Sequence, residues 1–530
     1  MSSSQQPQSL NAEATLSSLP PEWPTDLTET IAARVAAPSS SFSSDRDDDD
    51  DDHHQQKTII VVLDDDPTGT QTVHDLPVLT EWSEETLHAE FARNTPAFYI
   101  MTNSRSFAPE RAAEANDTIA RRLKGVAKRH GRRLSVISRS DSTLRGHYPL
   151  EIDVLARALQ DHDDDEIAGE VASSSMIDGQ IIIPFFLEGG RFTINNVHYV
   201  ADGTELIPAA DTPFANDAAF GFTKSNLSEY VEEKTRGRYP RDTVESITID
   251  DVRLGGPDAV RSKLSKLSGM RPCIVNAVTL RDAQVFALGL LDAEEKDGKR
   301  LLVRSAASFV QARIGLPKKP ILSASVILNN NNNGNNDSKN GDTNDEDNRN
   351  GGLVVVGSYV PKTTKQLESL LKLEGLETIE FDVADLVGDT AGTRDGDASS
   401  TSDAILERVQ KAIASGKNAV LYTSRTLVTG SSPAESLSIG NAVSRALVSV
   451  VSNLEVRPRF IVAKGGITSS DVATEGLGIR RAVVLGQACP GVPVWTIGEE
   501  GKFPGMSYVV FPGNVGGDDA LRDLVERLSE

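Results

Sequence analysis

The chain has little of what marks secreted, membrane-embedded or metal-stapled proteins. Its 530 residues include two cysteines, Cys273 and Cys489, which are too few for a disulfide framework and lack a metal-ligand spacing such as Cys-x-x-Cys. No apolar run approaches the roughly 20 residues that cross a bilayer. The amino-terminal residues contain neither a signal-peptide core nor the arginines of a transit peptide, so we expect a cytoplasmic protein.

Basic charge is also scarce. The formal net charge is -23, of which residues 1–56 carry -9 and residues 329–352 carry -3. The remaining -11 is ordinary for a soluble enzyme and argues against a nucleic-acid-binding surface. We therefore expect a small-molecule substrate, with neither a nucleic acid nor a membrane as partner.

Two common nucleotide-binding motifs are missing as well. No Gly-x-x-x-x-Gly-Lys-Ser/Thr sequence is present, which excludes a P-loop. No Gly-x-Gly-x-x-Gly follows the first predicted strand with an acidic residue about 20 positions later, which argues against an α/β dehydrogenase. Any nucleotide site in this chain must therefore use other glycine turns.

Low-complexity segments divide the chain into domains. Residues 1–56 are rich in Ser and Asp and are predicted to be a mostly disordered acidic extension, with one short helix that docks on a later domain. Residues 327–352 are rich in Asn and are predicted to be a disordered linker. Two regions with a mixture of apolar and helical patterns are left, at 57–326 and 353–530.

The pattern in both regions indicates the α/β fold class. Apolar runs predict strands at 58–63, 98–102, 134–138, 181–186, 273–278, 353–356, 419–423, 460–463, 482–485 and 508–511. Helical spacing appears between them, most clearly at 109–129, 363–373 and 434–453. This alternation predicts two α/β domains with mostly parallel sheets, and we expect the active site in the cleft between the domains.

Three predicted strands of the first domain end in polar clusters. The clusters are Asp64-Asp65-Asp66-Pro67-Thr68-Gly69-Thr70, Asn103-Ser104-Arg105 and Arg139-Ser140-Asp141-Ser142-Thr143-Leu144-Arg145. The carboxyl ends of adjacent parallel strands lie at one edge of a sheet, where α/β proteins bind ligands. Arginines, hydroxyls, amides and carboxylates gathered there suit a small, anionic, hydroxylated substrate. Helix capping and ion pairing at the sheet edge are the alternative for each cluster taken alone.

Glycine turns follow three predicted strands of the second domain. They are Gly357-Ser358, Lys464-Gly465-Gly466-Ile467-Thr468 and Pro512-Gly513-Asn514-Val515-Gly516. Glycine lets backbone N–H groups approach an anion, so each turn could cradle a phosphate, although tight strand-to-helix turns need glycine in any case. Lys464 could reach a phosphate, but we expect a lysine at a strand end to extend to solvent.

Together these motifs resemble the four-carbon acid sugar kinase family of the DUF1537 type. The resemblance spans residues 57–530. It rests on Asp-Asp-x-Thr-Gly at 65–69, Asn-Ser-Arg at 103–105, Asp-Ser-Thr-Leu-Arg-Gly at 141–146, Gly-Ser at 357–358, Lys-Gly-Gly-Ile-Thr-Ser at 464–469 and Pro-Gly-Asn-Val-Gly at 512–516. It implies an amino-terminal acid-sugar domain, a carboxy-terminal nucleotide domain, and transfer of phosphate from ATP with Mg²⁺ to 3-oxo-tetronate, threonate or erythronate, a step in carbohydrate metabolism.

The resemblance also assigns residues to the ligands. Those expected to contact ATP are Ser358, Gly465, Gly466, Ile467, Thr468 and Gly513. Those expected to bind the sugar acid, including residues taken from the three strand ends, are Asp65, Asp66, Asn103, Ser104, Arg105, Arg139, Ser142 and Arg145. Asp66, Asp141 and Arg105 are the expected catalytic residues. Asp66 is preferred as the base, Arg105 and Arg145 would hold the substrate carboxylate, and no metal ligand is assigned.

Two alternatives remain open from the sequence. A nonenzymatic nucleotide- or metabolite-binding protein on the same fold would also keep the glycine turns, although retention of Asp66, Arg105, Asp141 and Arg145 together favours catalysis. Pro67 and Thr70 replace the larger apolar residue and the Ala typical of bacterial members, which leaves the particular four-carbon acid open. The assembly is open as well, and a homodimer is allowed for.

Overall fold

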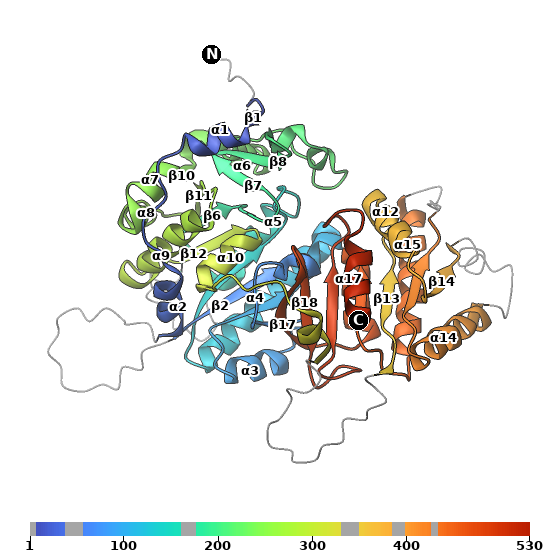
Figure 1. Ribbon diagram of the computed structural model, residues 1–530. Coiled ribbons are helices and arrows are strands. Elements are labelled where there is room, and N and C mark those ends of the chain that lie inside the picture. Colours follow the sequence, from blue (N-terminus) through green and yellow to red (C-terminus); the bar gives the residue numbers. More distant parts are fainter. Residues whose placement is uncertain (1–6, 38–56, 161–175, 330–348, 384–397, 426–432) are drawn as a thin grey trace. The chain divides into compact units, whose positions relative to one another are not determined.

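The computed structural model of the protein describes residues 7–37, 57–160, 176–329, 349–383, 398–425 and 433–530. The chain forms two compact units (Figure 1). Unit 1 comprises residues 1–69 and 81–318, and unit 2 comprises residues 70–80 and 319–530. Both units combine a large, mostly parallel set of strands with helices, which confirms the predicted α/β class.

The main strands of unit 1 are all parallel. Their order is β10 (Glu245–Ile247), β11 (Arg271–Val275), β6 (Gly179–Ile183), β12 (Leu301–Ser305), β5 (Arg133–Arg139), β2 (Thr58–Asp64) and β4 (Ala97–Met101). Strand β2 is buried on both faces, as expected for an apolar, β-branched run in the middle of a parallel sheet. Its last residue, Asp64, is in register with Met101 of β4 and Arg139 of β5. The three predicted polar strand ends are therefore neighbours.

Helices follow most of these strands. They are α3 (Glu84–Ala92), α4 (Pro109–Arg129), α5 (Leu150–Gln160), α6 (Leu227–Lys234), α7 (Ile249–Arg253), α8 (Gly256–Leu264), α9 (Leu280–Lys296) and α10 (Ala307–Ile314). Helix α4 begins with Pro109, whose fixed φ suits a first helical position, and its last turn carries Lys128 and Arg129. Its buried residues Ala112, Ile119 and Leu123 are spaced to form one apolar face.

A small antiparallel sheet and the amino-terminal segment complete unit 1. The sheet has the order β1 (Leu10–Asn11), β9 (Glu205–Pro208), β8 (Val197–Asp202) and β7 (Arg191–Ile194). Helix α2 (Thr28–Ala36) lies where a docking helix is predicted, with Ile31 buried and Arg34 Nη1 2.5 Å from Asp292 Oδ1 of α9. Strand β1 and helix α1 (Ala12–Ser17) form in a stretch where the composition indicated no packed structure.

The strands of unit 2 are parallel on one side and antiparallel on the other. Their order is β3 (Pro77–Leu79), β17 (Arg481–Cys489), β18 (Val492–Ile497), β19 (Ser507–Phe511), β16 (Ile461–Lys464), β13 (Leu353–Val356), β15 (Ala419–Thr423) and β14 (Glu377–Phe381). The five strands from β19 to β14 are parallel, whereas β3, β17 and β18 form antiparallel pairs. The parallel strands carry the glycine turns at their carboxyl ends.

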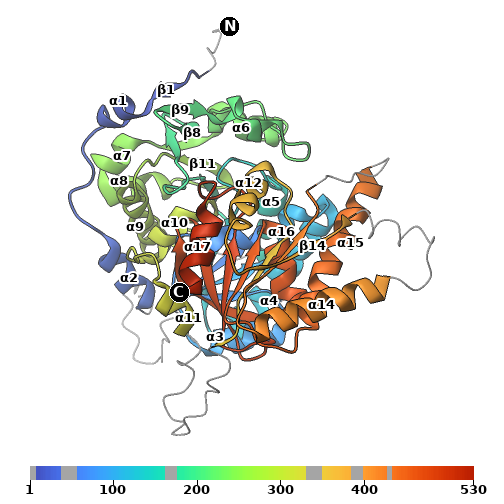
Figure 2. The ribbon, with the colours of Figure 1, turned by 45° about the vertical axis from the view of Figure 1, so that its right-hand side comes forward.

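Helices cover the sheet of unit 2. They are α11 (Ala324–Asn329), α12 (Pro361–Leu370), α14 (Ala398–Ala414), α15 (Pro433–Ser452), α16 (Gly466–Asp471) and α17 (Ala520–Ser529). Figure 2 shows α12 and α17 in front of this sheet. Leu367 of α12 and Leu524 of α17 share one core with Val354 and Val356 of β13. This core fixes β13, and with it the position of the turn that follows.

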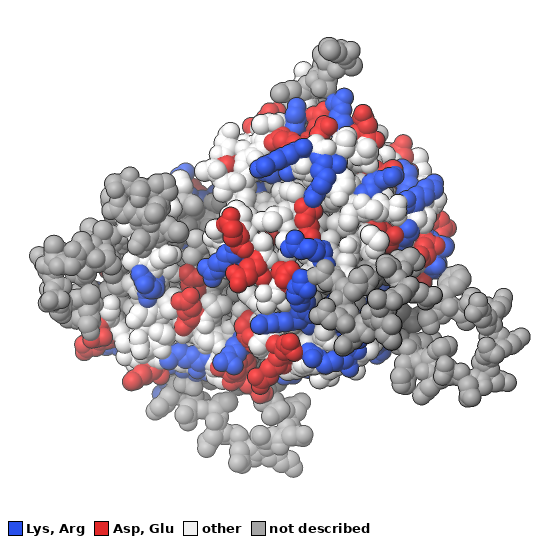
Figure 3. All heavy atoms as spheres, turned by 180° about the vertical axis from the view of Figure 1, so that it is seen from behind, with Lys and Arg blue, Asp and Glu red and all other residues white. Residues whose placement is uncertain are grey.

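The surface is mixed in charge. On the face drawn in Figure 3, lysine and arginine side chains are interspersed with aspartate and glutamate. In the part of the chain that the structure describes, no helix combines the length and the apolar character needed to cross a bilayer. Most of the acidic run and of the Asn-rich linker, at 38–56 and 330–348, lies outside the described residues.

Candidate functional site

Arg105 joins three carboxylates at the carboxyl edge of the unit 1 sheet. Its Nε donates to Asp65 Oδ2 at 3.2 Å, and its Nη2 donates to the other oxygen of the same carboxylate. Its Nη1 donates to Asp66 Oδ2 at 3.3 Å and lies 3.9 Å from Asp141 Oδ1. A guanidinium fork suits this two-point contact with a carboxylate. The structure therefore brings together the three expected catalytic residues, Asp66, Arg105 and Asp141.

A second ion pair lies beneath this cluster. Arg139 Nη1 donates to Asp64 Oδ1 at 3.0 Å, and both side chains are buried. Burial raises the pKa of Asp64 to about 7, and the charges of Asp65 and Asp66 add to this effect against the opposing pull of Arg139. Arg139, expected to bind substrate, is thus occupied with a protein carboxylate.

The pKa values of Asp66 and Asp141, the two carboxylates nearest to solvent, are lowered, in contrast to that of Asp64. Burial alone would raise the pKa of Asp66, but Arg105 and the two hydrogen bonds from Thr68, at 2.8 Å from N and 2.5 Å from Oγ1, lower it overall. Burial is likewise outweighed at Asp141, where Arg105 and Arg145 hold the pKa well below its usual range. Both groups are ionised at neutral pH and can act as proton acceptors.

Two arginines that sequence reasoning missed lie beside Asp141 and Arg145. Arg304 of β12 donates from Nη2 to the carbonyl of Arg145 at 3.0 Å. Arg191 of β7 and Arg145 both lie over the ring of Phe214, with Cζ of Arg191 at 5.8 Å and Cζ of Arg145 at 5.2 Å from the ring centroid. Among the described residues, the buried Arg191 Nε and Arg304 Nη1 have no hydrogen-bond partner.

Buried N–H donors are nearly always satisfied in folded proteins, so these two are available to donate to an anionic ligand. A sequence signal exists for Arg304, which stands one residue before the end of an apolar run, as a polar strand end would. Arg191 starts a short hairpin strand and carries no comparable signal.

The remaining residues expected to bind the sugar acid differ in their surroundings. Ser104 is fully buried and donates to Glu151 Oε1 at 2.6 Å, and Asn103 before it has a left-handed backbone with φ of 53°. The carbonyl of Ser142 lies 2.7 Å from His198 Nε2. Ser104 and the backbone of Ser142 therefore serve the packing of the loops. Burial and the charge of Asp65 raise the pKa of Glu151 to about 7, and sequence reasoning did not identify this residue.

The glycine turns of unit 2 converge on Ser358. Val356, Lys464 and Phe511 are in register on the adjacent strands β13, β16 and β19, so the turns after them share one sheet edge. Gly465 has φ of +117°, and a Cβ built on it would lie 2.7 Å from Ser358 Cβ. A Cβ on Gly513 would lie 3.5 Å from Ser358 Oγ. The close approach at Gly465 requires a residue without a side chain, whereas a Cβ at Gly513 would be in ordinary contact. The N–H of Gly465 donates to the carbonyl of Phe511 at 2.8 Å, so a phosphate would have to be held by other N–H groups of these turns.

Lys464 does not extend to solvent, so that expectation is wrong. The side chain is fully buried, and its Nζ donates to the carbonyls of Pro512 at 2.5 Å and Gly513 at 3.3 Å and lies 4.2 Å from the ring centroid of Phe511. The reason is that β16 lies between β13 and β19, so its end is enclosed. Burial lowers the pKa of Lys464 to about 7. Lys464 thus holds the Gly513 turn in place.

Two apolar side chains are exposed next to these turns. Tyr359 follows Ser358 and is 62% exposed, and Ile467 in the first turn of α16 is 61% exposed. Thr468, by contrast, is buried, and a Cβ on Gly357 would lie 2.4 Å from its Oγ1. The edge thus combines a backbone cradle for phosphates with an apolar surface of the kind that a nucleobase covers. The residues present fit a nucleotide.

A metal site is less well defined. Across the described residues, no group of three or more His, Cys, Asp or Glu side chains is arranged to hold a metal ion. The three consecutive aspartates do not form one, because Arg139 and Arg105 occupy their carboxylates. Binding of Mg²⁺ therefore stays a prediction.

Comparison with known proteins supports a sugar site in the first domain and a nucleotide site in the second. Residues 60–313 match the model of a sugar-binding N-terminal domain, and residues 353–521 match that of a nucleotide-binding C-terminal domain. No curated protein is significantly similar to the chain.

Two solved structures share its fold. HI1011 of Haemophilus influenzae, assigned to DUF1537, is 18% identical with a TM-score of 0.56, and the match covers 89% of this chain and 100% of that one. A Salmonella typhimurium LT2 protein with a provisional tRNA synthase name is 17% identical with a TM-score of 0.58, over 88% and 98%. The two domain models, matched in this order along the chain, show that the protein belongs to the four-carbon acid sugar kinase family.

Proposed function

We propose that the protein is an ATP-dependent kinase that phosphorylates a hydroxyl of a four-carbon sugar acid, namely 3-oxo-tetronate, threonate or erythronate. One observation carries the proposal: an unpartnered N–H group of Arg191 lies within the electrostatic reach of the ionised Asp141, and an unpartnered N–H group of Arg304 belongs to a guanidinium that donates to the carbonyl of the neighbouring Arg145. A ligand that satisfies this arrangement needs an anionic group for the arginines and a hydroxyl for the carboxylates.

The surroundings of each side chain suggest its role. Arg191 and Arg145 would hold the carboxylate of the sugar acid, since both stand over Phe214. Arg105 would orient Asp65 and Asp66 rather than hold the substrate directly, because its guanidinium already contacts their carboxylates. Asp66 would accept the hydroxyl proton, and its depressed pKa keeps it ready at neutral pH.

The turns of unit 2 would hold ATP. Backbone N–H groups in the turns that contain Gly465, Gly466 and Gly513 would contact the phosphates, apart from the N–H of Gly465 itself, which donates to the carbonyl of Phe511 at 2.8 Å. Ser358 and Thr468 would lie at the side of the phosphates and Ile467 toward the base. Phosphoryl transfer depends mainly on positioning and neutralisation of charge, and Mg²⁺ would supply part of that neutralisation when bound. An active site in the cleft between the domains, the domain boundaries, a homodimer and a cytoplasmic location stay predictions.

The test is turnover with a panel of sugar acids. Purified protein is incubated with ATP, Mg²⁺ and each four-carbon acid, and the phosphorylated product is followed by ³¹P nuclear magnetic resonance. We expect a new phosphate monoester signal with at least one acid and little ATP hydrolysis without it. Folded protein that binds ATP but phosphorylates none of the acids would contradict the proposal and favour a nonenzymatic binding protein.

A further inference from the structure

The loop that carries Asp141 and Arg145 has a backbone conformation that its residues do not all favour. Leu144 has φ of 71° and Gly146 has φ of 110°, both in the left-handed region. Glycine tolerates this region, but a leucine there costs free energy and persists only where the surroundings impose it. The contacts that impose this conformation therefore decide where the two charged groups of the loop stand.

Three buried side chains make hydrogen bonds to carbonyl groups of this loop. The pairs are His198 Nε2 with the carbonyl of Ser142 at 2.7 Å, the hydroxyl of Tyr230 with that of Leu144 at 2.9 Å, and Arg304 Nη2 with that of Arg145 at 3.0 Å. The three side chains belong to β8, α6 and β12. Elements that are far apart in the sequence thus fix the loop together.

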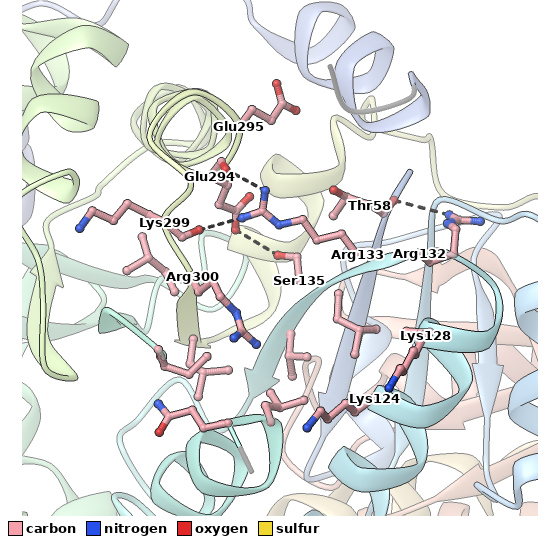
Figure 4. Close-up of a pocket in the computed structure, with 18 of the residues that line it drawn as sticks. Thr58, Lys124, Lys128, Arg132, Arg133, Ser135, Glu294, Glu295, Lys299 and Arg300 are labelled. Atoms are coloured by element: carbon pink, nitrogen blue, oxygen red, sulfur yellow. Dashed lines mark hydrogen bonds between the residues drawn. The ribbon is translucent and has the colours of Figure 1, made fainter. Parts of the chain in front are cut away.

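Contacts of the same kind hold the opposite edge of the sheet. At the amino-terminal ends of β5 and β12, next to a cavity of about 410 Å³, Arg133 donates to the carbonyls of Glu294 at 2.9 Å and Lys299 at 3.1 Å (Figure 4). There the contact joins β5 to the chain that enters β12. Donation to carbonyls therefore fixes the frame of the sheet at one edge and the candidate site at the other.

His198 also belongs to the hairpin that carries Arg191. In the register of β7 with β8, Thr193 pairs with His198, and Arg191 pairs with Val200. Residues two apart on a strand, and residues paired across two strands, have side chains on the same face of the sheet. Arg191, Thr193 and His198 therefore share one face of the small sheet. The contact of His198 with Ser142 shows that this face is directed at the loop.

The hydrogen bonds of His198 fix its tautomer. The Ser142 carbonyl can only accept, so Nε2 carries the proton. Burial lowers the pKa of the ring to about 4, so the ring is neutral at neutral pH and its Nδ1 accepts from the Thr193 hydroxyl at 3.0 Å. The backbone of Thr193 is bound in turn to that of Ala277 by two hydrogen bonds, at 3.1 and 3.2 Å. A continuous series of contacts thus runs from Ala277 to the loop.

We propose that His198 is a positioning residue of the sugar-acid site, which holds the loop at 141–146 at a fixed distance from Arg191. Arg191 and Arg145 both lie over the ring of Phe214, so a shift of the loop would change the gap that a substrate carboxylate has to bridge. His198 would act through these arginines and would not touch the substrate. This role in substrate binding rests on the proposed function, whereas the hold on the loop does not.

Hydrogen–deuterium exchange of the full, ligand-free chain tests the hold on the loop. Asparagine at position 198 would place its amide near the position of Nδ1, too far from Ser142, whereas the longer glutamine would place an N–H near the position of Nε2. We expect faster exchange than in the parent in peptides that cover 140–148 for His198→Asn, and about the exchange of the parent for His198→Gln. Unchanged exchange in these peptides for His198→Asn would overturn the proposal, whether or not the protein is a kinase.

Steady-state kinetics tests the role in substrate binding, with the four-carbon acid that the parent turns over fastest. For His198→Asn we expect KM for the acid to rise at least about fivefold, because a buried hydrogen bond is lost, while KM for ATP stays the same. His198→Gln should restore most of the affinity. Partial unfolding would instead lower kcat with the fraction of folded protein and leave both KM values unchanged, and that result would overturn the role in binding. Absence of turnover in the parent would contradict the proposed function alone, and the exchange experiment would still decide on the loop.

A second pair of variants covers the case in which His198→Asn does not fold. Thr193→Val removes the hydroxyl that fixes Nδ1 and should raise KM for the acid about two- to fivefold. Thr235→Val is the matched control, because Thr235 is buried in the same unit and its Oγ1 donates at 2.7 Å to the carbonyl of Val231, at the end of α6. The control should leave both KM values unchanged. Equal values of KM for the acid in these two variants would overturn the proposal.

Discussion

The backbone of Gly69 lies directly against the carboxylate of Asp64. A Cβ built at position 69 would be 1.9 Å from Asp64 Oδ2 and 2.2 Å from Oδ1. Asp64 cannot move aside easily, because its carboxylate is buried and paired with Arg139 at 3.0 Å. The glycine of the Asp-Asp-x-Thr-Gly motif is thus required by the fold of the site, in addition to any contact with substrate.

Gly69→Ala should therefore disrupt the site. We expect it to destabilise the protein by about 2 kcal/mol or more and to reduce turnover strongly, since a methyl group at this distance forces the turn or the ion pair to shift. Chemical denaturation and the kinase assay measure both effects. Gly125→Ala is the control: it lies in α4, where the nearest atom would be Arg129 Nη2 at 3.9 Å, and alanine favours a helix. Equal stability of both variants would contradict this reading.

The pH dependence of kcat should identify the base. The pKa of Asp66 is lowered, so with Asp66 as base kcat should stay level from about pH 5 to pH 7. A fall in kcat below about pH 7 would instead point to Asp64, whose pKa burial raises to about 7. Asp66→Asn should reduce kcat by about 10²- to 10³-fold with little change in KM. Asp117→Asn, at an exposed ion pair with Arg121 on α4, should leave kcat unchanged.

Arg191→Gln should weaken binding of the sugar acid. Loss of a half-buried guanidinium that would face the substrate carboxylate removes a charge-assisted contact, so we expect KM for the acid to rise at least about tenfold while KM for ATP stays the same. Arg191→Lys should retain part of the affinity. The control is Arg238→Gln, because Arg238 is an exposed partner of Asp153. A rise in KM for ATP alone would remove Arg191 from the sugar-acid site.

Gly465→Ala should impair nucleotide binding. Alanine is strained at φ of +117°, and its Cβ would lie 2.7 Å from Ser358 Cβ. We expect the dissociation constant for ATP, measured by titration calorimetry, to rise at least about tenfold while KM for the sugar acid changes little. Gly440→Ala in α15 is the matched control, since no atom lies within 4 Å of its added Cβ. Unimpaired ATP binding in Gly465→Ala would place the nucleotide elsewhere.

Glu151→Gln should change how stability depends on pH. Burial raises the pKa of Glu151 from 4.5 to about 7, so the folded state favours its protonated form. Its contribution to stability is complete below about pH 4.5 and is lost as pH rises through about 7. Glutamine stays neutral at every pH. The free energy of unfolding of the variant should therefore exceed that of the parent by about 1–3 kcal/mol at pH 8 and by little at pH 4.5. Urea unfolding at both values measures this.

Glu85→Gln is the control for that comparison, because Glu85 is exposed on α3. Glu85→Gln should change the free energy of unfolding by the same amount at both pH values. If the difference between Glu151→Gln and the parent also proves independent of pH, the carboxyl group of Glu151 is not held in its protonated form.

The sequence predicted the parallel core of both units well. Runs such as 58–63 and 353–356 are apolar and β-branched, and they fold as strands in the middle of sheets where such side chains pack on both faces. Strands β12 and β18 were missed. Each is followed or interrupted by polar residues, and each is held by long-range pairing with neighbours that no local pattern reveals.

The sequence predicted those residues of the site that come directly after a strand. Asp66, Arg105 and Asp141 come together because β2, β4 and β5 are adjacent and in register. Arg191 and Glu151 could not be found in this way. Arg191 begins a hairpin strand and Glu151 lies in the first turn of α5, and only the packed structure shows that buried polar atoms of both lack a partner among the described residues.

Residues 70–80 belong to unit 2 although the sequence on either side of them belongs to unit 1. The two units are therefore not two continuous segments that could be exchanged separately. Strand β3 from this segment pairs with Arg481–Val483 of β17, and Thr70 Oγ1 accepts a hydrogen bond from the indole of the fully buried Trp495 at 3.0 Å. A nucleotide half cloned from residue 353 onward would leave β17 with an open edge and Trp495 without this acceptor. A separately expressed or exchanged nucleotide unit therefore has to include β3.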